Sequence, residues 1–199
     1  MLDRNPLIYF EHTPYPLEKG CVLISVPLCG GGEYFERKVV LVLFHDEGGA
    51  YGLVLNKSTG VTYHQLFKIK RVNLPNVPLL GGGPVNIDHM YSLHNFGNLT
   101  KDTFFITDEF YFDPLSDEVI DKIDNDESRE SIVRVFFGCT GWSAGQLESE
   151  IERKMWVIGQ FQKELLFCDK DDDCWKMAVK SLGEKYMSWF DIVRKPELN

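Results

Sequence analysis

The chain has 199 residues, of which 44% are hydrophobic and 26% are charged, and its formal net charge is −9. A length of this order suits one domain that buries its own core without a metal or disulfides. The scattered basic residues argue against direct binding of nucleic acid, which needs clustered positive charge, and the longest apolar run, Val39 to Phe44, is far too short to span a membrane.

The first 19 residues differ from the rest in composition. They contain three prolines and mixed polarity, which predicts an extended N-terminal arm (residues 1–19) followed by a single domain (residues 20–199). The N-terminal residues lack the basic head and apolar stretch of a secretory signal. The odd number of cysteines without paired spacing indicates reduced thiols in a cytoplasmic protein. These cysteines are Cys21, Cys29, Cys139, Cys168 and Cys174.

Strand patterns dominate the start of the domain. Residues 21–26, 38–44 and 51–56 are apolar runs rich in residues that favour strands. Asp46 to Gly49 lies between the second and third runs and has the composition of a tight turn. The second and third runs therefore predict a β-hairpin, and a short helix is expected at residues 62–67.

The middle of the chain combines short strands with one helix. Strands are expected at residues 90–93, 104–107 and 131–137 because these runs are apolar or aromatic. Asp113 has the character of a helix N-cap, and Pro114 suits the first helical position. The segment therefore predicts a helix that begins at Asp113.

Two further helices are predicted in the last third. Ser143 and Gln146 have the S-x-x-Q spacing of a capping box. In the helix that follows, Glu150 is expected to face solvent and to pair with Lys154. A final helix should start near Asp172, where acidic residues suit the positive end of the helix dipole. Because strands and helices do not alternate regularly, the order predicts an α+β fold with a mainly antiparallel, strongly bent sheet.

Two side chains are candidate nucleophiles. Residues 141–145 read GWSAG, which matches the nucleophile motif G-x-S-x-G of α/β-hydrolases, but no histidine follows Ser143 as that fold requires. Cys139 lies in a glycine-flanked turn and would need His45 or His94 as a base. A hydrolase that uses Ser143 or Cys139 is therefore one hypothesis, and its alternative is that these residues are a helix cap and a small buried thiol.

Each candidate cofactor or metal motif lacks a residue that its chemistry requires. Residues 30–35 follow a strand and begin with three glycines, but an aromatic residue stands where a dinucleotide loop needs a small one. Residues 57–58 read Lys-Ser without the preceding glycine of a phosphate loop. Asp169, Asp171 and Asp173 have calcium-loop spacing without its glycine and glutamate. With no C-x-x-C or H-x-x-x-H pair, the sequence predicts no cofactor and no metal.

Four ordered blocks of residues resemble the YqgE/AlgH family of bacterial proteins. They extend from about residue 20 to residue 183, most of the chain. The blocks are Gly20 to Pro27; His45 with Gly49 to Lys57; Gly82 to Val85 with Leu93-His94; and Gly138, Trp142, Gly145 to Glu148 and Trp156.

The resemblance implies a fold and no settled activity. The fold is a compact α+β domain whose bifurcated sheet curls into a pseudo-barrel with flanking helices. Members carry the label of transcriptional regulator, which came from a genetic effect on alginate production. They usually have Asp-Pro-x-Phe after the first strand, where this chain has Gly32 to Phe35. A functional role that depends on this aspartate in the family is therefore not expected in this chain.

The same blocks supply a binding hypothesis. If they line one cleft, their polar and aromatic side chains form its walls and the Gly-Gly-Pro backbone its floor, a mixture that suits a small polar ligand or a peptide segment. The alternative is that these residues serve turn geometry and helix capping. The candidate binding residues are Asn56, Gly82, Gly83, Pro84, His94, Trp142 and Gln146.

Three functions remain open at this point. The leading hypothesis is a cytoplasmic module that binds a small ligand or a protein partner and regulates indirectly. The second is the hydrolase. The third is a transcriptional regulator that binds DNA directly, which the net charge of −9 disfavours. Neither a membrane nor direct contact with nucleic acid is expected.

Overall fold

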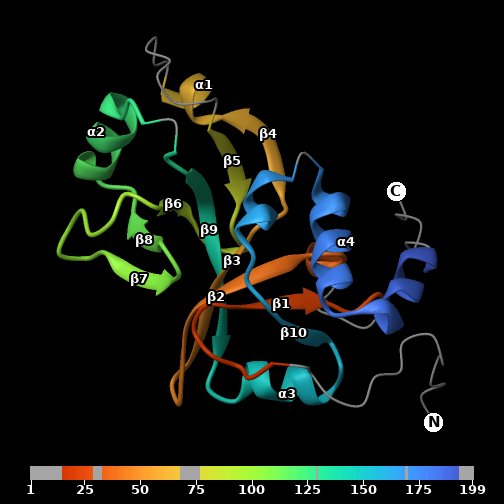
Figure 1. Cartoon of the computed structure of the whole chain (residues 1–199). Coiled ribbons are helices and arrows are strands. Elements are labelled where there is room, and N and C mark those ends of the chain that lie inside the picture. The colour runs from red at the N-terminus through yellow and green to blue at the C-terminus, as the bar shows by residue number, and fades with distance from the viewer. Residues whose placement is uncertain (1–14, 29–32, 68–76, 129, 169, 193–199) are drawn as a thin grey trace.

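The computed structural model in Figure 1 describes residues 15–28, 33–67, 77–128, 130–168 and 170–192, so most of the predicted N-terminal arm lies outside the described residues. The strands are β1 (Cys21–Ser25), β2 (Val39–Asp46), β3 (Gly49–Val54), β4 (Ser58–Thr62), β5 (Pro78–Gly81), β6 (Val85–His94), β7 (Phe104–Thr107), β8 (Phe110–Pro114), β9 (Val133–Ser143) and β10 (Trp156–Gln160). The helices are α1 (Tyr63–Phe67), α2 (Asp117–Asn125), α3 (Gln146–Glu152) and α4 (Asp171–Ser181), with 3-10 turns η2 (Glu33–Phe35), η3 (Lys163–Phe167) and η4 (Glu184–Asp191).

A single open sheet runs through the described part of the chain. Its strands follow the order β10-β1-β2-β3-β9-β6-β8-β7, and every pairing along this order is antiparallel. Strand β5 pairs in parallel with β9 and antiparallel with β4. The predicted α+β fold with a mainly antiparallel sheet is therefore confirmed.

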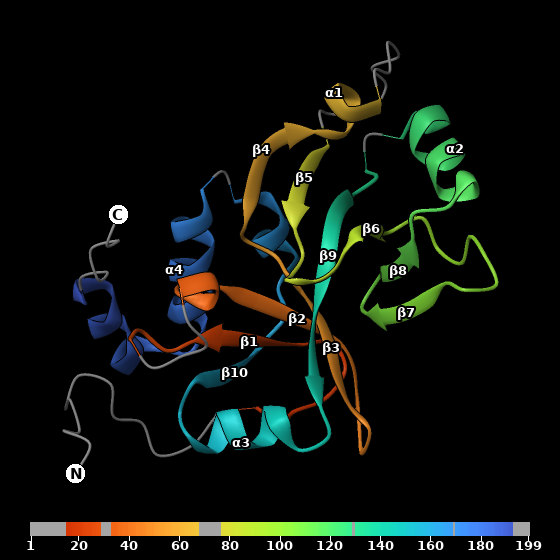
Figure 2. The same cartoon turned by 180° about the vertical axis from the view of Figure 1, so that it is seen from behind.

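Strand β9 is the point at which the sheet divides. Residues 135–137 pair with β5 on one edge and with β6 on the other, whereas residues 140–143 pair with β3. Figure 2 shows β9 passing from the group of β5 and β6 to the group of β3 and β2. Gly138 lies at the change of partner with a φ of 66°, a backbone conformation that favours glycine. The sheet therefore bifurcates along β9, at the point where this strand changes its partners.

Three apolar clusters attach the helices to this sheet. The largest packs α4 and η4 against the β1–β2 region, and Trp175 and Trp189 are buried in it. A second lies under α3 and contains Leu147. A third contains Val119 and Ile123 of α2. Each large side chain that is fully buried stabilises the fold by about 1.5–3 kcal/mol, so these clusters hold the helices against the sheet.

The predicted hairpin is confirmed and two predicted helix starts are wrong. Strands β2 and β3 pair antiparallel up to Asp46 opposite Gly49. Asp113 belongs to β8, and α2 begins at Asp117 after the N-cap Ser116, whose Oγ accepts the N–H of Val119. Ser143 is the last residue of β9, and α3 begins at Gln146. At both positions, pairing within the sheet places in a strand a residue that the local sequence pattern predicts as a helix cap.

Candidate functional site

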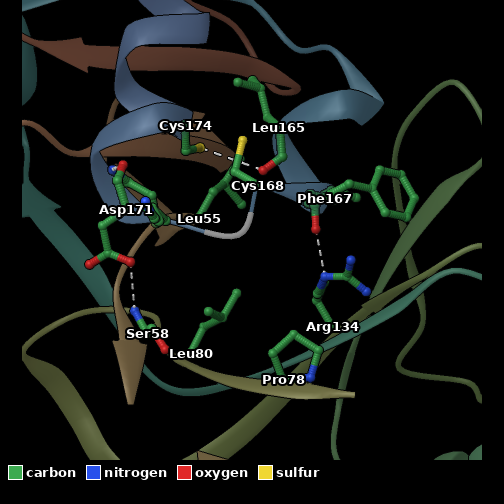
Figure 3. A pocket seen from close by; sticks show the side chains of 13 residues that line it. Leu55, Ser58, Pro78, Leu80, Arg134, Leu165, Phe167, Cys168, Asp171 and Cys174 are labelled. Carbon is green, nitrogen blue, oxygen red and sulfur yellow. Dashed lines mark hydrogen bonds between the residues drawn. The ribbon is translucent and has the colours of Figure 1, made fainter. Parts of the chain in front are cut away.

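A cavity of about 300 Å³ lies between strands β4 and β5, strand β9, η3 and the start of α4 (Figure 3). This volume is at the lower end of the range of about 300–1,000 Å³ found for small-molecule pockets. Its lining combines apolar residues with charged and polar ones. The lining residues are Leu55, Asn56, Ser58, Pro78, Leu80, Arg134, Leu165, Leu166, Phe167, Cys168, Lys170, Asp171 and Cys174.

Asn56 lies at this cavity as a buried clamp between distant segments. Its Oδ1 accepts the N–H of Val39 at 2.8 Å. Its Nδ2 donates to the carbonyl of Arg37 at 2.8 Å and to the carbonyl of Asp171 at 2.8 Å. The amide therefore joins the start of β2 to the start of α4, and its polar atoms are already engaged within the protein.

The carboxylate of Asp171 is likewise engaged. Its Oδ1 accepts the backbone N–H of Ser58 at 3.1 Å, and its Oδ2 lies 3.2 Å from Nζ of Lys38. Figure 3 shows Asp171 and Arg134 on opposite sides of the cavity. The negative charge of Asp171 is therefore compensated by a lysine that does not line the cavity.

Arg134 supplies the opposite wall. Its Nε donates to the carbonyl of Leu166 at 2.7 Å and its Nη1 to the carbonyl of Val133 at 2.8 Å, so two of its five N–H groups are used. The guanidinium lies 5.1 Å from the ring centre of Phe167. The side chain is half-buried, and this burial lowers the pKa of Arg134. Within the described residues, no carboxylate forms a salt bridge with this guanidinium.

The charge of the lining is consequently positive, although the chain as a whole is acidic. Lys170 also lines the cavity, is exposed, and forms no salt bridge with another described residue. Arg134 and Lys170 are thus two cations near a carboxylate that already binds Lys38. A negatively charged or strongly polar small molecule would complete the electrostatics of this site.

Gly82 and Gly83 meet strand β9 instead of this cavity. A Cβ on Gly83 would lie 2.1 Å from the carbonyl carbon of Cys139, and one on Gly82 would lie 2.3 Å from the carbonyl oxygen of Gly138. The N–H of Gly82 donates to the carbonyl of Phe137 at 2.7 Å. These glycines therefore allow two backbones to touch. Pro84 follows them and is exposed.

Trp142 and Gln146 come together at α3, around Glu150. The Oε2 of Glu150 accepts the indole N–H of Trp142 at 2.9 Å and that of Trp156 at 2.8 Å, and its Oε1 accepts Nε2 of Gln146 at 3.0 Å. The predicted outward orientation of Glu150 is therefore wrong. Gln146 also accepts the backbone N–H of Ser143 at 3.1 Å, which is one half of the predicted capping box.

His94 lies in a third place, fully buried against β8. Its Nε2 lies 2.9 Å from Oδ2 of Asp113, and its Nδ1 accepts the N–H of Phe96 at 3.3 Å. Burial lowers the pKa of His94, and the hydrogen bond with Asp113 opposes that shift. The other oxygen of Asp113 accepts the hydroxyls of Thr100 at 2.8 Å and Thr103 at 2.9 Å. The seven candidate binding residues thus occupy separate regions, and of them only Asn56 lines the cavity of Figure 3.

The candidate nucleophiles and the candidate bases each have other partners. His94 pairs with Val133 and Val85 with Cys139, so His94 and Cys139 are six residues apart along β9, about 20 Å. Burial raises the pKa of Cys139, the opposite of what an activated thiol needs. The Oγ of Ser143 donates to Gln146 at 3.0 Å, and His45 binds Glu148 at 2.7 Å. Among the hydrogen bonds of the described residues, neither nucleophile contacts a histidine.

Comparison with known proteins places this geometry in a family. Residues 22–187 match the family described as AlgH-like. The chain belongs to this family. A UPF0301 protein of Parabacteroides distasonis is 33% identical over 100% of both chains. A UPF0301 protein of Chlamydia caviae is 34% identical over 94% of this chain and 98% of its own.

Solved structures agree with this AlgH-like assignment. The AlgH protein of Pseudomonas aeruginosa is similar with a TM-score of 0.69 and 25% identity, covering 88% of this chain and 94% of its own. A protein of Corynebacterium diphtheriae has the same fold with a TM-score of 0.72 and 20% identity, covering 95% of this chain and 98% of its own. The family resemblance inferred from the four sequence blocks is confirmed.

Sequence reasoning missed the residues that give this AlgH-like cavity its charge. Arg134 stands between two buried valines in a strand that otherwise reads as core, and a lone arginine in such a run was the available signal. Among the described residues, no group of three or more His, Cys, Asp or Glu side chains is arranged to hold a metal. None of the helices in the described residues could span a lipid bilayer.

Proposed function

We propose that this AlgH-like protein is a cytoplasmic binding module for a small anionic metabolite, and that it regulates indirectly through that ligand. One observation carries the proposal. The guanidinium of Arg134 lines a cavity of about 300 Å³, belongs to a half-buried side chain, and has no carboxylate partner among the described residues. Charges held away from water are normally paired, so an unpaired arginine at a cavity indicates an anionic partner.

The remaining lining agrees with a carboxylate or phosphate ligand. Arg134 retains N–H groups in the planar arrangement that binds such groups through two hydrogen bonds. Lys170 adds a second cation at the exposed side. The apolar residues of β5 and η3 offer contact surface for the rest of a small molecule.

The observations favour this proposal over the two alternatives. A hydrolase needs a base beside Ser143 or Cys139, and the described hydrogen bonds of these residues lead elsewhere. Direct binding of DNA needs a basic surface, whereas the net charge is −9. The indirect regulatory role follows the family label and belongs to the same proposal.

A thermal-shift screen of the purified protein with anionic, neutral and cationic metabolites tests the proposal. A ligand at 100 times its dissociation constant stabilises the protein by about 2.7 kcal/mol, or roughly 5–11 °C at this chain length. We expect the anionic class to give this shift and Arg134→Met to abolish it. The matched control Arg153→Met changes an exposed arginine outside the cavity and should keep the shift.

Two further variants test the second cation of the cavity and an alternative ligand site at α3. Lys170→Gln removes an exposed charge and should weaken the ligand several-fold without loss of stability. Trp142→Ala tests whether the candidate residues at α3 form the site instead. A shift lost in Trp142→Ala but kept in Arg134→Met would place the ligand at α3. No shift with any class would reject the ligand proposal and favour a protein partner.

A further inference from the structure

Two cysteines, Cys168 and Cys174, lie side by side in the wall of the cavity. Cys168 follows η3 and is half-buried, whereas Cys174 belongs to the first turns of α4 and is 1% exposed. The Sγ of Cys168 donates to the carbonyl of Glu164 at 3.8 Å, and the Sγ of Cys174 donates to the carbonyl of Leu165 at 3.5 Å. The two thiols thus bind consecutive carbonyls of one 3-10 turn, which brings the sulfur atoms together (Figure 3).

Cys168 also affects the protonation of Cys174. A hydrogen bond with Cys168 is the largest cause of the raised pKa of Cys174, and burial is the second. Both residues are thiols in this structure. Cys21 and Cys139 lie on β1 and β9, and each is a separate buried thiol. Among the described cysteines, Cys168 and Cys174 are therefore the two whose thiols bind the same 3-10 turn.

We propose that Cys168 and Cys174 form a redox-active pair that a peroxide converts to an intramolecular disulfide. The half-buried Cys168 reacts first, because the cavity gives access to its sulfur. Its thiolate attacks one peroxide oxygen, the O–O bond breaks, and the second oxygen leaves as hydroxide, which yields a sulfenic acid. The sulfur of Cys174 then attacks the sulfenic sulfur, the S–O bond breaks, and the hydroxyl leaves with the Cys174 proton as water.

Two electrons pass from the sulfur atoms to the peroxide in this sequence, and a dithiol reductant reverses it. The new bond would join the end of η3 to α4, two segments that both line the cavity. It would replace the two S–H···O bonds to the carbonyls of Glu164 and Leu165. Disulfides in reducing compartments are typically transient and signal redox state, which is the role that this pair would have. The inference does not depend on the identity of any ligand.

Hydrogen peroxide treatment of the full-length protein, followed by alkylation and peptide mass spectrometry, tests the inference. We expect a linked peptide pair containing Cys168 and Cys174, with the loss of two hydrogens and reversal by dithiothreitol. Cys168→Ser and Cys174→Ser should each abolish the link, whereas Cys139→Ser, which changes a buried thiol elsewhere, should retain it. Circular dichroism checks that each variant is folded.

A second measurement tests which of the two cysteines reacts first. In Cys174→Ser, the sulfenic acid on Cys168 should persist and react with dimedone, whereas in Cys168→Ser the buried Cys174 should remain unmodified. Three results would overturn the inference. They are over-oxidation of Cys168 in the wild-type protein without a link, a disulfide that uses Cys21, Cys29 or Cys139, and linkage only between molecules.

Discussion

Replacement of Asn56 by alanine should strongly destabilise the protein, because this side chain joins segments far apart in sequence. The substitution leaves the N–H of Val39 and the carbonyls of Arg37 and Asp171 without their partner. A buried polar group left without a hydrogen bond costs about 1–3 kcal/mol. Asn56 itself is only 3% exposed, although the carbonyl of Asp171 is partly accessible to water.

The expected loss in the free energy of unfolding is therefore about 3–5 kcal/mol, a large part of the roughly 5–15 kcal/mol typical of a domain. In melting temperature this corresponds to a decrease of about 6–20 °C. Urea unfolding followed by circular dichroism measures the change, with an unchanged m-value as the sign that the unfolded state is the same. Asn56→Asp should be similarly destabilising, because it turns an oxygen toward two carbonyl oxygens.

The exposed Asn98 supplies the matched control, and Asn98→Ala should change stability by less than about 0.5 kcal/mol. A decrease of less than about 1 kcal/mol in the free energy of unfolding of Asn56→Ala would contradict the role of Asn56 as a clamp. Asn56→Ala is also unsuitable as a test of ligand binding, because loss of binding in this variant would reflect loss of structure. Arg134 and Lys170 are therefore the better positions at which to test binding.

Three further predictions concern the other clusters. Glu150→Gln should cost about 1–3 kcal/mol and change tryptophan fluorescence, because a neutral amide replaces the carboxylate that two indole N–H groups share; an unchanged urea midpoint would contradict this. Gly83→Ala should cost at least about 3 kcal/mol because its Cβ would lie 2.1 Å from backbone atoms, whereas Gly141→Ala, whose Cβ would be 3.4 Å from a side-chain atom, should be nearly neutral in the same assay. Because burial lowers the pKa of His94 below its usual 6.5, the unfolded state binds a proton that the folded state refuses, so stability should fall by up to about 1.4 kcal/mol per unit as the pH drops below 6.5. His94→Gln should flatten this slope, and equal slopes would count against the buried neutral histidine.

Much of the fold could be predicted because its signals are local. The turn at residues 46–49 and the aromatic run at residues 104–107 specify short-range pairing, and both predictions are confirmed. The local pattern at Asp113 wrongly predicts a helix start because Asp-Pro is common there, whereas pairing of β8 with β6 decides its conformation. Strand β10 was missed because it follows α3 almost directly and its partner β1 lies far away in sequence.

The site was harder to predict for the same reason. Asn56 is a candidate in the sequence, but its partners are 17, 19 and 115 residues away, so its role as a clamp cannot be read locally. Trp142 and Gln146 were expected to share a cleft with His94, and β9 separates them by its length. Arg134 gave a readable signal, a cation inside an apolar strand, whose meaning depends on the cavity formed by η3 and α4.

Titration of the ¹⁵N-labelled protein with citrate and with inorganic phosphate, monitored by amide chemical shifts, tests the anion site at Arg134. We expect saturable shifts at residues of the cavity, including Ser58, Arg134 and Lys170, with at least one of the two anions. Arg134→Met should remove these shifts while the rest of the spectrum stays that of a folded protein. Saturable shifts confined to α3, equal shifts in the variant, or no saturable shift with either anion would contradict an anion site at Arg134.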